Sequence, residues 1–145
     1  MIDADDNPSG RWESVKSACL KSIPDLPEHL PKTGLIHTTA EGIKFGIWIM
    51  PDNQMQGMLE TFLAYLVPDE SEPLWKYAQE VVIEAKNTGA SFIDNHFDKA
   101  LIYTWLAWQN PPGRQIHQAV MEKILNPQHP KAQMFVTWFK DLYDL

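Results

Sequence analysis

Two carboxylates near the N-terminus have the spacing of a metal site. Asp3 and Asp5 stand two residues apart, in what reads as the end of a strand. Residues i and i+2 of a strand face the same way, so the two side chains would project side by side. Carboxylates so close repel each other unless a hard cation lies between them. The pair therefore predicts a Mg²⁺ (or Mn²⁺) site, and the plainer alternative is an acidic terminus that binds nothing.

Two more acids follow the next buried strand. Asp52 comes directly after the apolar run that Pro51 ends, and Glu60 lies near the start of the following helix. If the strands run parallel, Asp52 shares a sheet edge with Asp3 and Asp5, and Glu60 can point back over that edge. Taken singly, Asp52 is typical of a turn and Glu60 of a first-turn carboxylate that favours the helix dipole. The metal-site hypothesis is that these four acids lie together at one edge of the sheet and bind the ion.

Lys99 is the cation of the otherwise apolar segment 97–109. One interpretation is a surface lysine whose stem lies along apolar groups. The other is a catalytic lysine that stabilises charge developing on a phosphoryl oxygen.

Other kinds of site are excluded by spacing. An EF-hand loop starting at Asp3 would place Pro8 where glycine is needed and Ser14 where glutamate is needed. The five histidines and the single Cys19 show no zinc-ligand spacing. No glycine-rich phosphate loop and no Gly-x-Ser-x-Gly elbow is present, so no nucleotide fingerprint and no cofactor beyond the metal ion is predicted.

Composition bounds the class of protein. The chain has 145 residues, 44% of them hydrophobic, and a net charge of −7. This length and apolar content suit one compact domain with a sizeable core. No apolar run is long enough to cross a membrane, and one cysteine fits a reducing compartment, so we expect a cytoplasmic protein. The acidic balance disfavours binding of nucleic acid by charge alone.

The elements that would position these residues can be read from periodicity. Strands are expected at the N-terminus and over 35–39 and 43–50, the last two joined by a three-residue hairpin loop, 40–42. The second run is apolar on both faces, which predicts an interior strand with helices on both sides. Helical periodicity then marks the remaining elements, together with one early helix. The early helix is expected to span about a dozen residues, capped by Asn7 or Ser9. The other expected helices cover about 57–67, 74–87, 97–109, 116–125 and 134–142.

Several blocks of this sequence resemble an uncharacterised TOPRIM-related bacterial family. They are the Asp-x-Asp segment 2–6 with 11–14, the blocks 46–53 and 57–60, and Lys99-Ala100 with the Trp-Leu-Ala-Trp-Gln and Pro-Gly motifs of 105–113. The resemblance runs over most of the chain. It implies an α/β fold with a Rossmann-like, TOPRIM-like mixed sheet flanked by helices. It assigns Mg²⁺ binding to Asp3 and Asp5, with Asp52 and Glu60 on the same edge and Lys99 as a nuclease lysine.

The sequence departs from the TOPRIM pattern at its start. In TOPRIM domains a glutamate-bearing strand precedes the Asp-x-Asp strand, and none precedes Asp3 here. We therefore expect a single TOPRIM-like domain, N-terminally incomplete, with an α/β portion (1–67) and a helical portion (68–145) packed on it. The open sheet edge would be covered by a partner strand or by another copy in a homo-oligomer.

Two functions follow from this reading. The leading hypothesis is a metal-dependent nuclease or phosphotransferase that reaches nucleic acid through its metal ions, which activate water and neutralise phosphate. The alternative is a catalytically inert interaction or regulatory module that keeps the fold.

Overall fold

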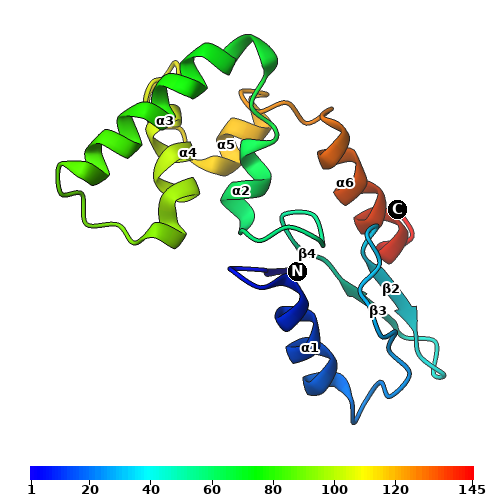
Figure 1. The fold of residues 1–145 in the computed structure, drawn as a ribbon. Helices are drawn as coiled ribbons and strands as arrows, with labels where there is room; N and C mark the ends of the chain where they lie inside the picture. The colour runs from blue at the N-terminus through cyan, green and yellow to red at the C-terminus, as the bar shows by residue number, and fades with distance from the viewer. The chain divides into compact units, whose positions relative to one another are not determined.

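The structure, a computed structural model, describes all residues, 1–145. It is a mixed α/β protein in which helices predominate over four short strands (Figure 1). The strands are β1 (Ile2–Asp3), β2 (Leu35–Thr38), β3 (Lys44–Ile47) and β4 (Ile49–Met50). The α-helices are α1 (Pro8–Cys19), α2 (Leu59–Ala64), α3 (Glu72–Asn87), α4 (Phe97–Ala107), α5 (Ile116–Met121) and α6 (Pro130–Tyr143), with 3₁₀ turns η1 (Asp69–Ser71) and η2 (Asp94–His96).

The chain divides into two compact units. The first comprises residues 1–62 and 130–145, and the second comprises residues 63–129. The first unit contains all four strands together with α1 and α6. It therefore differs from the predicted α/β portion, 1–67, in two respects: the last helix groups with the strands, and residues 63–67 belong to the second unit. None of the helices is both long enough and apolar enough to cross a membrane.

The run expected as one strand, 43–50, is two strands with different partners. β3 pairs antiparallel with β2, in register Leu35↔Ile47, across the expected hairpin loop 40–42. β4 pairs parallel with β1, in register Ile2↔Ile49. Trp48 stands between the two strands, where the chain changes partner. The strands thus form two separate two-stranded sheets, one antiparallel and one parallel, where the sequence predicts a single small mixed sheet.

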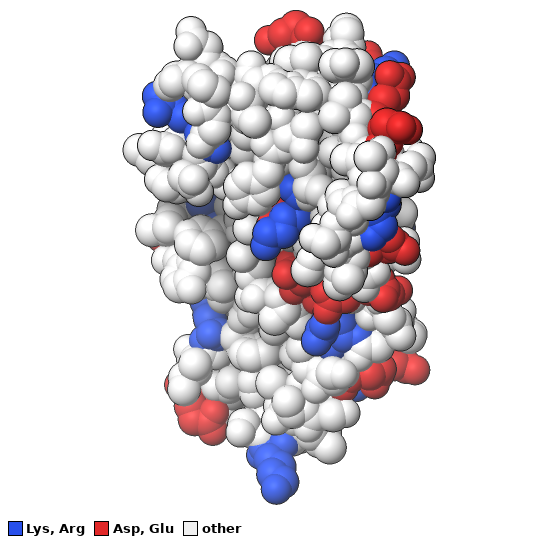
Figure 2. All heavy atoms as spheres, turned by 90° about the vertical axis from the view of Figure 1, so that its left-hand side faces the viewer, with Lys and Arg blue, Asp and Glu red and all other residues white.

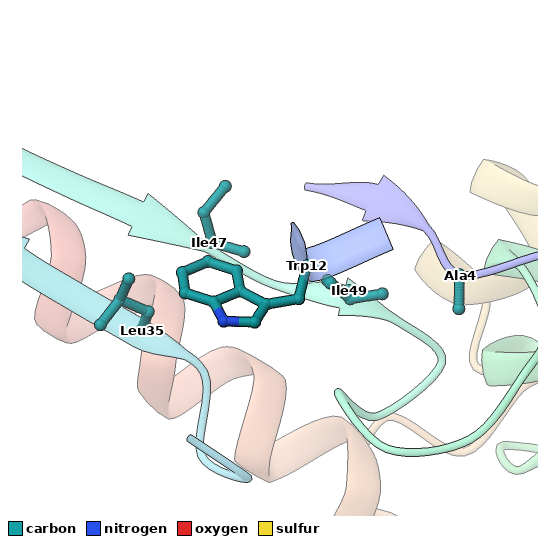
Figure 3. Packing of buried hydrophobic residues seen from close by; sticks show 5 residues of the cluster. All are labelled: Ala4, Trp12, Leu35, Ile47 and Ile49. Carbon is teal, nitrogen blue, oxygen red and sulfur yellow. The ribbon is translucent and has the colours of Figure 1, made fainter. Parts of the chain in front are cut away.

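Apolar residues cover both faces of these strands, as the pattern of 43–50 predicts. On one face the Trp12 ring of α1 packs among Leu35, Ile47 and Ile49, with Ala4 in the same cluster (Figure 3). The Nε1 of Trp12 donates a hydrogen bond to the Glu28 carbonyl (3.0 Å), which fixes the ring and the proline-rich loop together.

The other face is covered by α6. Trp48 packs edge-on against Phe135 (ring centroids 5.3 Å apart) and lies 5.6 Å from Trp138. Trp138 donates from Nε1 to the Leu35 carbonyl (3.0 Å). α1 and α6 therefore sandwich the strands (Figure 1).

The second unit has a core of its own. α3 packs on α4, and Trp75 meets Trp105 edge to face at 5.9 Å. The apolar segment predicted over 97–109 is buried along one side, while Tyr103 and Trp108 stay about 40% exposed. The fully buried residues of the second unit include Leu101, Ile102, Trp105, Leu106, Ala119 and Leu125.

Candidate functional site

The parallel pairing of β1 with β4 places two predicted acids at one sheet edge. Asp3 is the last residue of β1 and lies opposite Met50, the last residue of β4. Asp52 follows two residues later. The carboxyl ends of the two strands point the same way, which is the condition on which the predicted convergence depends.

Asp3 joins this edge to α2. Its Oδ1 accepts a hydrogen bond from the backbone N–H of Leu59 (3.0 Å), the first residue of the helix. This bond satisfies one of the donors that a helix leaves unpaired at its N-terminus. Glu60, the next residue, is buried with 9% of its surface exposed. The link between Asp3 and α2 therefore holds Glu60 near the edge that carries Asp3.

Asp5 lies beyond the regular part of β1. Its φ is +52°, and its backbone pairs with Gly57 through two hydrogen bonds (2.9 and 2.8 Å). The alternation of side chains along a strand therefore does not extend to Asp5. The predicted side-by-side arrangement with Asp3 depended on that alternation. The Asp5 carboxylate pairs with the guanidinium of Arg11, on the first turn of α1. Asn7 caps that helix by accepting from the Gly10 N–H (2.8 Å).

Asp52 is buried and pairs with Lys131 of α6. Its Oδ1 also accepts from the N–H groups of Met55 (3.0 Å) and Gln54 (3.3 Å), which makes it the turn residue of the plainer interpretation. Burial by itself would raise the pKa of the Asp52 carboxyl. The hydrogen bonds and the charge of Lys131 outweigh burial and hold this pKa below its ordinary value. Asp52 is therefore a carboxylate with its own cation.

Asn53 builds the turn that carries Asp52. Its φ is +65°, a left-handed conformation that asparagine tolerates better than most residues. Its side-chain Oδ1 accepts from the Ile49 N–H (2.8 Å), and its Nδ2 donates to the Lys32 carbonyl (3.1 Å). These bonds fasten the end of β4 to the loop before β2, so Asn53 is a structural part of the edge.

Lys99 lies on α4, in the second unit, and its side chain is exposed. The four acids all belong to the first unit. Its catalytic role stays a prediction that rests on the sequence resemblance.

Sequence reasoning missed the two cations of the edge. Arg11 stands six residues after Asp5 and within a block of the resemblance, so a local signal existed. Lys131 is 79 residues from Asp52, and nothing in the chain between them points to the contact. No group of three or more His, Cys, Asp or Glu side chains is arranged to hold a metal ion.

Residues 1–144 match the family described as Protein of unknown function (DUF3226). The chain belongs to the DUF3226 family. This match covers both units, so both the strands of the first unit and the helical residues 63–129 are part of the family's sequence pattern. No curated protein and no solved structure matches the chain.

Proposed function

We propose that the edge formed by the ends of β1 and β4 binds Mg²⁺ or Mn²⁺ and acts on phosphodiester bonds. The observation that carries the proposal is the parallel register of the two strands, which sets Asp3 and Asp52 at one edge. The hydrogen bond from Leu59 to Asp3 adds the start of α2 and Glu60. Ligand sites in α/β sheets form just beyond the carboxyl ends of parallel strands.

The donors present suit an ion that keeps much of its water. Mg²⁺ commonly takes one or two carboxylates, with waters and substrate phosphates filling the remaining positions. Asp3 is exposed, and its Oδ2 makes no hydrogen bond or ion pair within the chain. Asp5 and Asp52 are held by Arg11 and Lys131. We therefore assign the ion to Asp3 first, with Glu60 as a further carboxylate of the same edge and with Asp5 and Asp52 positioning the two cations.

Such an ion would neutralise a phosphate and lower the pKa of a bound water. Arg11 and Lys131 can donate charge-assisted hydrogen bonds to phosphate oxygens. In the view of Figure 2, acidic and basic side chains are interspersed and no continuous basic surface is present. With a net charge of −7, affinity for nucleic acid would then depend on the metal ion and on these local cations.

Calorimetric titration with Mg²⁺ and Mn²⁺ tests the metal site. Asp3→Asn keeps an oxygen that can accept from the Leu59 N–H and removes the charge, so the fold is preserved. We expect the variant to bind the ion at least about tenfold more weakly than the wild type. Glu70→Gln, an exposed acid elsewhere, is the matched control and should leave binding unchanged. Negligible binding in the wild type would overturn the metal site.

Hydrolysis of labelled DNA and RNA strands in Mn²⁺ tests the chemistry. Cleavage should require the ion, stop on addition of a chelator, and be lost in Asp3→Asn but not in Glu70→Gln. Cleavage that persists in Asp3→Asn at the same rate would show a contaminant or another site.

The second candidate function is an inert interaction or regulatory module that retains the fold. The observation that favours it is that Asp5 and Asp52 already have cationic partners, Arg11 and Lys131. Folded wild type, as judged by cooperative thermal unfolding, that binds neither ion and cleaves no substrate would support this function over the first.

A further inference from the structure

β2 has a free edge. Thr39 donates its N–H to the Ile43 carbonyl (2.9 Å), and bonded and non-bonded pairs alternate along an antiparallel ladder. Leu35 and His37 therefore exchange hydrogen bonds with β3. Ile36 directs its backbone N–H and C=O away from β3, and no other strand pairs with that side.

A groove runs beside this edge. Its volume is about 670 Å³, within the usual range of ligand pockets. One wall comes from β2 and the residues before it, and the other comes from α6. Both walls belong to the first unit. Its principal lining residues are Thr33, Ile36, Gln133, Met134, Thr137 and Asp141.

We propose that this groove binds an extended peptide segment carrying Lys or Arg, which adds to β2 as a further strand. In such β-strand addition, main-chain hydrogen bonds to the free edge supply affinity, and alternate side chains enter the adjoining pockets. Ile36 supplies the main-chain donor and acceptor. Met134 and Ile36 supply apolar contact, and Thr33 and Thr137 supply hydroxyl groups to the peptide.

The charge of the groove selects a basic segment. Asp141 is its one charged lining residue; its carboxylate is exposed and has no ion-pair partner. The neighbouring cation, Lys44, is already held by the Asp144 carboxylate and donates to the Asp141 carbonyl (3.0 Å). An acidic peptide or a phosphate would meet an unpaired carboxylate here, whereas a lysine or arginine would pair with it.

The groove includes none of Asp3, Asp5, Asp52 and Glu60, so the inference stands apart from the proposed metal chemistry. Two blocked hexapeptides serve as probes, acetyl-Thr-Val-Arg-Val-Arg-Thr-amide and its counterpart with Glu in place of Arg. Backbone amide shifts of the full chain are recorded by NMR during titration. We expect the Arg peptide to shift Ile36, Thr38 and the 133–141 segment, and the Glu peptide to shift none of them at equal concentration.

Variants of the edge locate the contact. Ile36→Pro removes the outward N–H at a position where an edge strand tolerates proline, and should weaken binding about tenfold. Ile36→Val keeps the N–H and a similar side chain and should bind like the wild type. Asp141→Asn, at an exposed position, should weaken binding about threefold without affecting the fold.

Several results would overturn the proposal. They are equal binding of the Glu peptide, undiminished binding by Asp141→Asn, absence of binding by the wild type, or shifts confined to residues 63–129. A dimer found by sedimentation without peptide, and dispersed by Ile36→Pro, would assign the edge to a second copy of the chain instead.

Discussion

Asp52 joins the loop after β4 to α6 through one charge pair, in which the carboxylate is buried and the Lys131 side chain is partly exposed. Because its pKa in the folded protein lies below the ordinary 3.8, the ionised carboxylate stabilises the fold above that pH. The contribution is lost as pH falls through the lowered pKa. We expect Asp52→Asn to lower the free energy of unfolding by about 1–3 kcal/mol at pH 7. The difference from the wild type should shrink towards zero below pH 3.8.

Urea unfolding of both proteins between pH 7 and pH 3 measures this difference, and the comparison cancels the titration of all other groups. Lys131→Met is the partner variant and should be destabilised at pH 7 as well. The two changes together should cost less than the sum of the single changes, because they share one interaction. A constant gap between wild type and Asp52→Asn across the pH range would contradict the assignment.

At this scale the sequence predicted the acids better than their partners. The place of Asp3 and Asp52 at one edge follows from counting residues past the ends of two strands. The pairing of Asp52 with Lys131 depends on where α6 lies, and no local pattern encodes a contact 79 residues distant. The left-handed backbone conformation of Asp5 was also not predicted, because the argument from strand alternation assumes that the strand continues to this residue.

α6 packs closely on two glycines, Gly34 in the loop just before β2 and Gly46 in β3. At Gly34 (φ +81°) an added Cβ would lie 2.5 Å from Cδ1 of Trp138 and 2.9 Å from Cε3 of Trp48. At Gly46 it would lie 2.4 Å from Cδ2 of Leu142, the end of a flexible side chain. The rings cannot move aside as readily, so Gly34 is the tighter constraint on the α6 packing.

We expect Gly34→Ala to be strongly destabilising. A left-handed φ costs a residue with a Cβ about 1–2 kcal/mol, and overpacking against the two rings adds about 1–3 kcal/mol. Gly42→Ala is the matched control, since its φ is +80° and nothing lies within 4 Å of the added carbon. Urea unfolding should show Gly34→Ala below Gly42→Ala in stability. Equal losses would show that α6 does not pack closely on this loop.

The spacing of apolar residues predicted the helices well where these residues line one face of the helix. The helices over 72–87, 97–107 and 130–143 agree with the expected segments to within a few residues. The run 43–50 was expected as one strand, and it is two, because its first half pairs with β2 and its second half pairs with β1. Alternation of apolar residues is the same in both halves, so pattern alone does not show a change of partner.

On the scale of the whole chain, the first unit is assembled from both ends of the sequence. α6 belongs with the strands because Phe135 and Trp138 pack on Trp48. The sequence predicts α6 only as an amphipathic helix, and its apolar stripe does not indicate the surface on which the helix packs. A division after residue 67 was therefore the natural prediction, although the residues that complete the first unit come last.

Because each unit has a buried core of its own, we expect the full chain to unfold in two calorimetric transitions. Ile49 and Ile102 are a matched pair, both fully buried, one in each unit. Replacement of either by alanine should cost about 2–5 kcal/mol in its own unit. Ile49→Ala should lower the midpoint of one transition and Ile102→Ala that of the other. A single transition lowered by both variants would show instead that the two cores unfold together.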